Sequence, residues 1–142
     1  MKWSLLAVVL LAGCASVAQN SEHIMRIEFS TLTRGYQELV TFTSDSVKFS
    51  RTQAGKPKIA EAHVIKKNDW QELLKVVQKI TLSEIPELKS PTMKRSFDGA
   101  RHSTITIITD SNQTYIHSFD DENPHEKLQA LMKVIIKKRG KK

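Results

Sequence analysis

The spacing of apolar residues changes twice along the chain, and this change limits the folds that the chain can adopt. From residue 24 to residue 65, apolar and polar residues alternate, as Ile27 and Phe29 do with Arg26 and Glu28. A period of two is typical of half-buried strands. Turn residues divide this region into four predicted strands, at residues 24–33, 36–43, 47–52 and 58–65. Their short connections predict an antiparallel meander.

A helical period then replaces the alternation. A stripe of apolar residues at helical spacing predicts a helix that packs on the sheet; it consists of Trp70, Leu73, Leu74, Val77 and Ile80. Asn68, three residues before Gln71, predicts a capping-box start. Residues 82–88 include Pro86 and predict a packed irregular segment.

The same change of period occurs again in the second half. A loop at residues 90–103 precedes a predicted hairpin of residues 104–109 and 114–119. Asn123, Pro124 and Glu126 are typical of the cap, first and third positions of a final helix. Its predicted buried face contains Leu128, Leu131, Met132 and Ile135. Strands followed by a helix, twice, predict an α+β fold, with an antiparallel sheet of about six strands and two helices packed on one face.

The first residues have a different character. After Lys2, residues 3–12 are almost wholly apolar, too short a run to cross a bilayer as a mature helix. A basic start, an apolar run and small residues at its end are typical of a secretory signal. Leu11-Ala12-Gly13-Cys14 resembles the lipobox of bacterial lipoproteins. The alternative is an ordinary signal peptide with an incidental cysteine.

The lipobox resemblance implies that Cys14, the only cysteine of the chain, receives a diacylglycerol and becomes the first residue after cleavage. Two or three acyl chains make a firm membrane anchor. The predicted organisation is then a signal peptide at 1–13, a lipidated tether at 14–23, one domain at 24–136 and a basic tail at 137–142. Ala15 follows the cysteine where an aspartate would favour the inner membrane. In a Gram-negative host, the resemblance implies an outer-membrane lipoprotein facing the periplasm.

The net charge of +7 is concentrated at one end of the chain. Lys2 leaves with the signal, and five cations lie in residues 137–142, so the remainder carries +1. A nearly neutral domain does not predict nucleic-acid binding. The basic tail could contact anionic headgroups or another envelope polyanion. The alternative is that these cations favour a helix C-terminus and are solvated.

The loop at residues 90–103 is the first candidate binding site, because loops of this length are often functional. It carries Lys94, Arg95 and Arg101 beside Asp98, with Phe97 as an apolar group. An arginine pair could grip a carboxylate or phosphate. The alternative is a turn in which Asp98 pairs with an arginine and the next residue, a glycine, takes a positive φ.

Arg34 and Tyr36, at the tip of the first predicted hairpin, are the other candidate ligand-binding residues. Exposed tyrosine and arginine are enriched in protein-contact hot spots. The alternative is that Tyr36 covers the sheet edge while Gly35 permits the turn.

No catalytic residue, metal site or cofactor is predicted. Ser96, Asp98 and His102 lie close together in the sequence, but no nucleophile elbow of the G-x-S-x-G kind accompanies them. Four further residues have side chains that ligate metals, at spacings that match no known zinc pattern. They are His117, Asp120, Asp121 and His125.

The segments RIEFSTLTRGY, DWQELLKVV, SPTMKRSFDGA and SFDDENP, with a closing helix, resemble short uncharacterised lipoproteins of Gram-negative bacteria. That resemblance implies the architecture and no activity. The layout, a late aspartate and a proline-started final helix are more distantly similar to emfourin-type metalloprotease inhibitors.

Three functions follow as expectations. The first is a membrane-anchored, non-enzymatic binding module that holds or inhibits a protein partner. The second is an enzyme that acts on an envelope polymer or anionic ligand through residues 90–103. The third is a structural envelope protein with a polyanion-binding tail.

Overall fold

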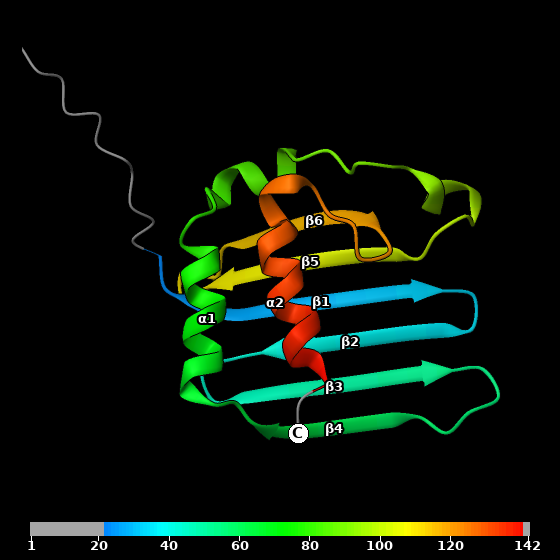
Figure 1. Ribbon diagram of the computed structural model, residues 1–142, viewed down its shortest axis with the longest axis horizontal. Helices are drawn as coiled ribbons and strands as arrows, with labels where there is room; N and C mark the ends of the chain where they lie inside the picture. Colours follow the sequence, from blue (N-terminus) through cyan, green and yellow to red (C-terminus); the bar gives the residue numbers. More distant parts are fainter. Residues whose placement is uncertain (1–21, 141–142) are drawn as a thin grey trace, which may run out of the picture.

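A computed structural model describes residues 22–140 of the chain (Figure 1). The predicted signal peptide, Cys14 and most of the tether lie outside the described residues, as do Lys141 and Lys142. The strands are β1 (Ile24–Thr33), β2 (Tyr36–Phe42), β3 (Ser46–Gln53), β4 (Ile59–Val64), β5 (His102–Thr109) and β6 (Thr114–Asp120). The helices are α1 (Lys67–Val77) and α2 (Gln129–Arg139), with short 3-10 turns η1 (Leu82–Glu87), η2 (Lys94–Phe97) and η3 (Glu126–Leu128). The predicted α+β layout is confirmed.

All six strands form one antiparallel sheet in the order β4-β3-β2-β1-β5-β6. β1 lies inside the sheet, where Phe29 is opposite Val40 of β2 and Ile105 of β5. Because side chains alternate between faces, this register places the apolar residues of neighbouring strands on one face.

Both helices cover that face, and the core lies between them and the sheet (Figure 1). α1 buries Trp70, Leu73 and Val77, and α2 buries Leu131, Met132 and Ile135. Each such side chain contributes about 1.5–3 kcal/mol when it leaves water. The elements and core described here lie within residues 22–140, so a chain trimmed to residues 20–142 retains them.

The two edges of the sheet differ. β6 contacts η1 and η2, which form part of the segment that runs along this edge (Figure 1). β4 pairs with β3 on one side only, and no described element lies beyond it. Every residue of β4 is exposed except His63, which is half-buried.

The helix starts differ from the predicted ones. α1 begins at Lys67 with no side-chain cap, so the predicted capping box at Asn68 is wrong. The second helical region begins at η3, where the His125 side chain accepts from the Lys127 amide. Asn123 does not cap it; its Oδ1 accepts from Gln129 Nε2 at 2.9 Å. At the second helical region, a side-chain contact with Gln129 therefore takes the oxygen that was expected to cap the helix.

The C-terminal cations also lie differently from the predicted tail. α2 continues to Arg139, so three of the five cations are helical. Lys137 binds Glu72 at 3.0 Å, and Arg139 binds Glu122 at 2.7 Å. Lys138 is buried. These three side chains belong to the folded body.

Candidate functional site

Asp120 fixes the predicted binding loop at residues 90–103. Its side chain is 3% exposed. Oδ2 accepts from Thr92 Oγ1 and from the Lys94 amide, both at 2.6 Å. Oδ1 accepts from Arg95 Nη1 at 2.7 Å and from the Arg95 amide at 3.3 Å. Burial raises the pKa of Asp120, but hydrogen bonds from Thr92, Arg95 and the two amides outweigh it and lower the pKa from 3.8 to about 2.

Arg95 is committed to this structural contact. Its side chain is 13% exposed and also donates to Ser90 Oγ and the Thr92 carbonyl. The expected positive φ does not occur at Gly99; Asp98 takes it instead, at 56°. Asp98 does pair with an arginine, because Arg34 Nη2 lies 2.9 Å from its Oδ2. The contacts of Asp98 and Arg95 therefore match the structural alternative for this loop.

Some of the predicted site residues meet and others do not. Arg34 contacts Asp98, and the Arg101 guanidinium lies 5.8 Å from the centre of the Tyr36 ring. The first hairpin tip and the 90–103 loop are thus neighbours. Phe97 is 86% exposed and outside the core. Lys94 contributes its backbone amide to Asp120.

A buried carboxylate on β2, near the first hairpin, was not predicted. Glu38 is 1% exposed on the helix side of β2. Its Oε2 accepts from Tyr36 Oη at 2.7 Å and from Arg51 Nε and Nη2 at 3.0 and 2.8 Å. Its Oε1 makes no hydrogen bond among the described residues but lies 3.3 Å from Arg139 Nη1. The hydrogen bond to Glu38 raises the pKa of Arg51, whereas burial and Glu38 together raise that of Tyr36.

A buried cation lies beside Arg139 at the same C-terminal end of α2. Lys138 is 2% exposed and binds Asp69 and Glu72 of α1 at 2.5 and 2.6 Å. Burial lowers the pKa of Lys138, but the two carboxylates outweigh it and raise the pKa. Lys138 and Lys137 lower the pKa of Glu72 to about 2. These contacts fix α2 against the start of α1.

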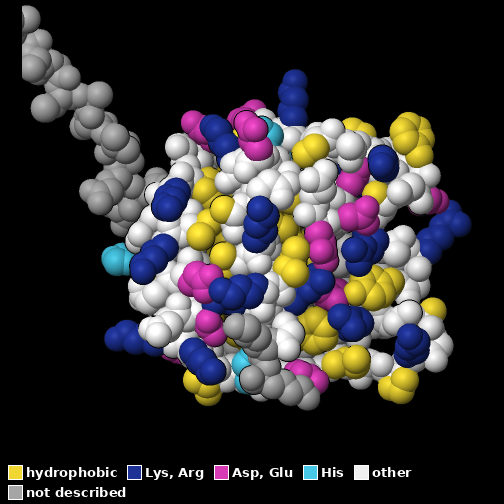
Figure 2. Space-filling view, viewed as in Figure 1, with side chains coloured by type: hydrophobic (Ala, Val, Ile, Leu, Met, Phe, Trp, Pro, Cys, Tyr) yellow, Lys and Arg dark blue, Asp and Glu magenta, His cyan; other side chains and the backbone are white. Residues whose placement is uncertain are grey.

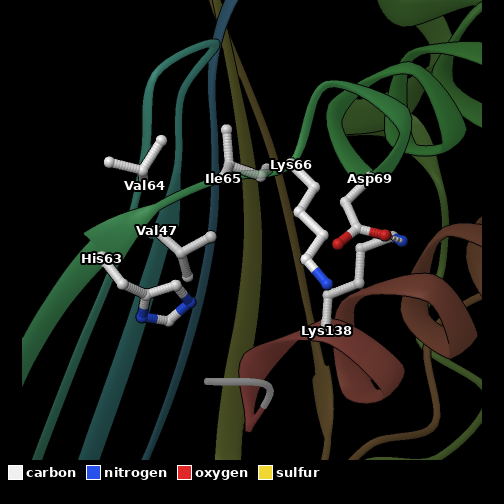
Figure 3. A pocket seen from close by; sticks show the side chains of 7 residues that line it. All are labelled: Val47, His63, Val64, Ile65, Lys66, Asp69 and Lys138. Atoms are coloured by element: carbon white, nitrogen blue, oxygen red, sulfur yellow. Dashed lines mark hydrogen bonds and ion pairs between the residues drawn. The ribbon is translucent and has the colours of Figure 1, made fainter.

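A groove lies between these charges and the β4 edge, and we call it the edge groove. Its first hollow, of about 130 Å³, is bounded by both helices and by β3 and β4. Figure 3 shows His63 and Val47 on the sheet side, with Lys66 extending toward Lys138. The second hollow, of about 280 Å³, shares His63. Its further lining residues are Phe49, Arg51, Ile59, Glu61, Arg139 and Gly140.

The edge groove combines apolar and charged surface. Phe49 and Ile59 supply apolar contacts, and Arg51 lies 5.0 Å from the centre of the Phe49 ring. In Figure 2, apolar side chains reach the surface beyond α2, over the ends of the strands, between basic and acidic groups. Arg51 and Arg139 are both held by Glu38, so their positions are fixed before any ligand binds. This arrangement suits binding.

Two shallower hollows lie on the opposite face of the sheet. They have volumes of about 410 and 430 Å³. The first lies over β2, β3 and β4 and includes Leu39, Lys48 and Ala62. The second lies beside the first hairpin and includes Leu32 and Tyr36. Neither contains a histidine or an acidic pair that would support catalysis.

The histidines and aspartates near β6 serve structural contacts. His117 is buried, stacks on Phe119 at 5.5 Å, and its Nε2 accepts from the His125 amide at 3.2 Å. Burial, followed by His125 and Arg95, lowers the pKa of His117. Within residues 22–140, no group of three or more histidine, cysteine, aspartate or glutamate side chains could hold a metal ion.

The edge groove was missed by sequence reasoning, although signals for it existed. Glu38 has the same strand parity as Val40 and Phe42, which indicates an inward position. Lys138 follows Ile135 by three residues, on the buried stripe of α2. β4 is short, with a charged residue and weak alternation, and a short strand that carries charge is typical of a sheet edge.

No family model matches the chain, and no curated protein matches it at a significant level. Among residues 22–140, none of the helices has the length and apolar character needed to span a bilayer.

Proposed function

We propose that the protein is a lipid-anchored, non-enzymatic binding module of the cell envelope that holds or inhibits a protein partner. The edge groove receives an extended segment of that partner. The observation that carries this proposal is the groove itself, in which the apolar Phe49 and Ile59 lie beside arginines that Glu38 already holds in place.

Preorganisation favours binding at this site. Ordering a free side chain on binding costs about 0.5–1.5 kcal/mol. Arg51 donates twice to Glu38, and Arg139 is held by both Glu38 and Glu122, so this cost is already met in the free protein. Ile59 is 41% exposed, and covering it would add apolar burial.

The two other expected functions have less support. An enzyme that uses the 90–103 loop needs converging free polar groups, but Asp120 holds Arg95. A polyanion-binding tail needs free cations, but the three tail cations within residues 22–140 are paired with carboxylates; they are Lys137, Lys138 and Arg139.

The membrane part of the proposal depends on the lipobox resemblance of Cys14. Seven residues separate Cys14 from Glu22. Fully extended, they reach about 25 Å, which would keep the domain beside its membrane. Mass spectrometry of the membrane-extracted protein tests this part directly. A chain that begins at acylated Cys14 is expected, and an unmodified thiol contradicts it.

Site-specific photocrosslinking tests the groove in cells. A photoreactive amino acid at Ile59 is expected to capture one partner protein reproducibly. Ile116 is a matched control, since it is 48% exposed on the distant strand β6. Ile59→Glu in the same chain is expected to remove partner binding, while Ile116→Glu retains it.

The outcome at Ile59 decides the proposal. Capture of the same protein in equal yield from both positions indicates no specific use of the groove. If Ile59 yields no heterologous adduct, the proposed protein partner at this site is wrong. Circular dichroism of both glutamate variants checks that they remain folded.

A further inference from the structure

The sheet has one edge that nothing covers among the described residues. β4 pairs with β3 and presents its other backbone edge outward, whereas β6 contacts η1 and η2 (Figure 1). Uncovered strand edges readily pair with another strand, and proteins usually protect them with charge, proline or a bulge. Pro57 and four lysines flank β4, at positions 56, 58, 66 and 67, but the strand itself carries neither proline nor lysine and only one charged residue, Glu61.

We infer that β4 pairs antiparallel with β4 of a second copy of this chain, with the two-fold axis at Ala62. An antiparallel pair of identical strands has its axis perpendicular to the sheet, so directly opposed residues lie on the same face. This axis places Glu61 opposite His63 of the partner copy, and Ala60 opposite Val64. Residues 60–64 of β4 are then paired with the same five residues of the partner copy.

The side chains are complementary in this register. On the helix side, opposed Glu61 and His63 occur twice, because the two-fold axis repeats the contact. An imidazole N–H of His63 can donate a hydrogen bond to the Glu61 carboxylate, and polar cross-strand pairs of this kind are stabilising. On the other face, Ala60, Ala62 and Val64 form a continuous small apolar strip, since these residues share one parity.

Moving the two-fold axis to a neighbouring residue of β4 gives less favourable pairing. An axis at Glu61 places two carboxylates directly opposite each other, which is destabilising. An axis at Ala60 leaves Ala62, His63 and Val64 beyond the overlap with the partner strand. An axis at His63 puts Glu61 opposite the apolar Ile65, and Ile65 is buried in its own chain. Of these registers, only the axis at Ala62 places Glu61 opposite His63 and pairs residues 60–64 with one another.

This pairing also completes the edge groove. In one chain the groove has helices on one side and ends at β4, through Ile59, Glu61 and His63. The two-fold axis keeps both helix layers on the same face of the joined sheet. The two grooves then meet across the paired strands, with the α2 ends of both copies as opposite walls.

Cysteine crosslinking tests the register, because residues 20–142 contain no native cysteine. Opposed Cα atoms in an antiparallel pair are about 4.5 or 5.5 Å apart, and both distances suit a disulfide. Ala62→Cys is therefore expected to form a covalent dimer under mild oxidation. Ile116→Cys, at an exposed position on β6, is the matched control and should remain monomeric.

Mixed variants test the register further. Glu61→Cys and His63→Cys are expected to crosslink with each other more than either does with itself, because same-residue pairs lie on the diagonal at about 7–8 Å. Sedimentation of the unmodified residues 20–142 is expected to give twice the mass of one chain. Ala62→Lys places like charges at the axis and is expected to halve that mass, whereas Thr114→Lys on β6 retains it.

A single-chain mass for the unmodified protein, with no disulfide at Ala62→Cys, overturns the inference. A dimer in which Ile116→Cys crosslinks as well as Ala62→Cys overturns it too, since the contact is then elsewhere. This inference shares the edge groove with the proposed function, but its readouts are separate. Heterologous capture at Ile59 tests the partner, and the mass of the purified chain tests the pairing.

Discussion

Replacing Asp120 by asparagine removes the charge that fixes the loop at residues 90–103. The pKa of Asp120 falls from 3.8 to about 2 in the folded protein. A tenfold change in acid dissociation corresponds to about 1.4 kcal/mol, so the ionised carboxylate contributes about 2 kcal/mol. The substitution also leaves the guanidinium of Arg95, which is 13% exposed, without its counter-ion. Breaking a buried pair costs about 3–5 kcal/mol. We expect Asp120→Asn to lose about 2–4 kcal/mol at pH 7.

Urea unfolding of residues 20–142 measures this loss. Trp70 is the only tryptophan in that range and is 7% exposed, so its fluorescence reports unfolding. The folded pKa of Asp120 lies below the unfolded value, so its contribution is present above about pH 4 and disappears as the pH falls toward 2. The stability difference between wild type and Asp120→Asn should therefore narrow over that interval.

Asp121→Asn is the matched control. Asp121 is the next residue, is half exposed, and lies 3.3 Å from Arg101 Nε. Surface pairs of this kind contribute about 0–1 kcal/mol. A loss in Asp120→Asn no larger than in Asp121→Asn would refute the role given to Asp120. A difference that stays constant between pH 7 and pH 2 would refute the electrostatic reasoning.

Lys138→Met should lower the free energy of unfolding by about 1–3 kcal/mol because it leaves two carboxylates without their shared cation, whereas Lys137→Met should cost less than about 0.5 kcal/mol; equal urea midpoints would contradict this. Gly35→Ala should lose about 1–2 kcal/mol in thermal unfolding, because φ is 70° and the new Cβ would lie 3.0 Å from another Cβ. Gly55→Ala has a similar φ of 75° and open space, so a loss above that of Gly35→Ala would contradict the steric part. The His117 ring should titrate below pH 6.5 in NMR, because burial lowers its pKa, and stability should fall as the pH drops through 6.5; titration at or above 6.5 would contradict this.

Local periodicity was sufficient to predict the sheet and the two helices. Alternation placed Ile27 and Phe29 in the core, and helical spacing placed Trp70 and Leu73 there. Both signals arise from burial of one face, which the sequence carries directly. The start predicted for the final helix was wrong because Asn123 contributes its side-chain oxygen to Gln129 instead of a cap. Such competition between partners is a tertiary effect.

The candidate site was less predictable because its contacts join distant residues. Arg95 and Asp120 are 25 positions apart, and Arg34 and Asp98 are 64 apart. Composition showed that the 90–103 loop was rich in arginine, but only the fold shows which arginine is already paired. The edge groove depends on strand order, which leaves β4 at the border of the sheet. No local pattern specifies that order.

Within residues 22–140, the β4 edge of the sheet is uncovered and the β6 edge is not, and this difference limits how many chains the inferred pairing can join. When a sheet has one uncovered edge, pairing through that edge occupies it in both chains, so the assembly stops at a dimer. Two uncovered edges would allow chains to add without limit. In the inferred β4 pair, the segment along β6, which includes η1 and η2, would therefore stop further chains from adding to the sheet. If mutation or proteolysis releases that segment, soluble particles should give way to fibres.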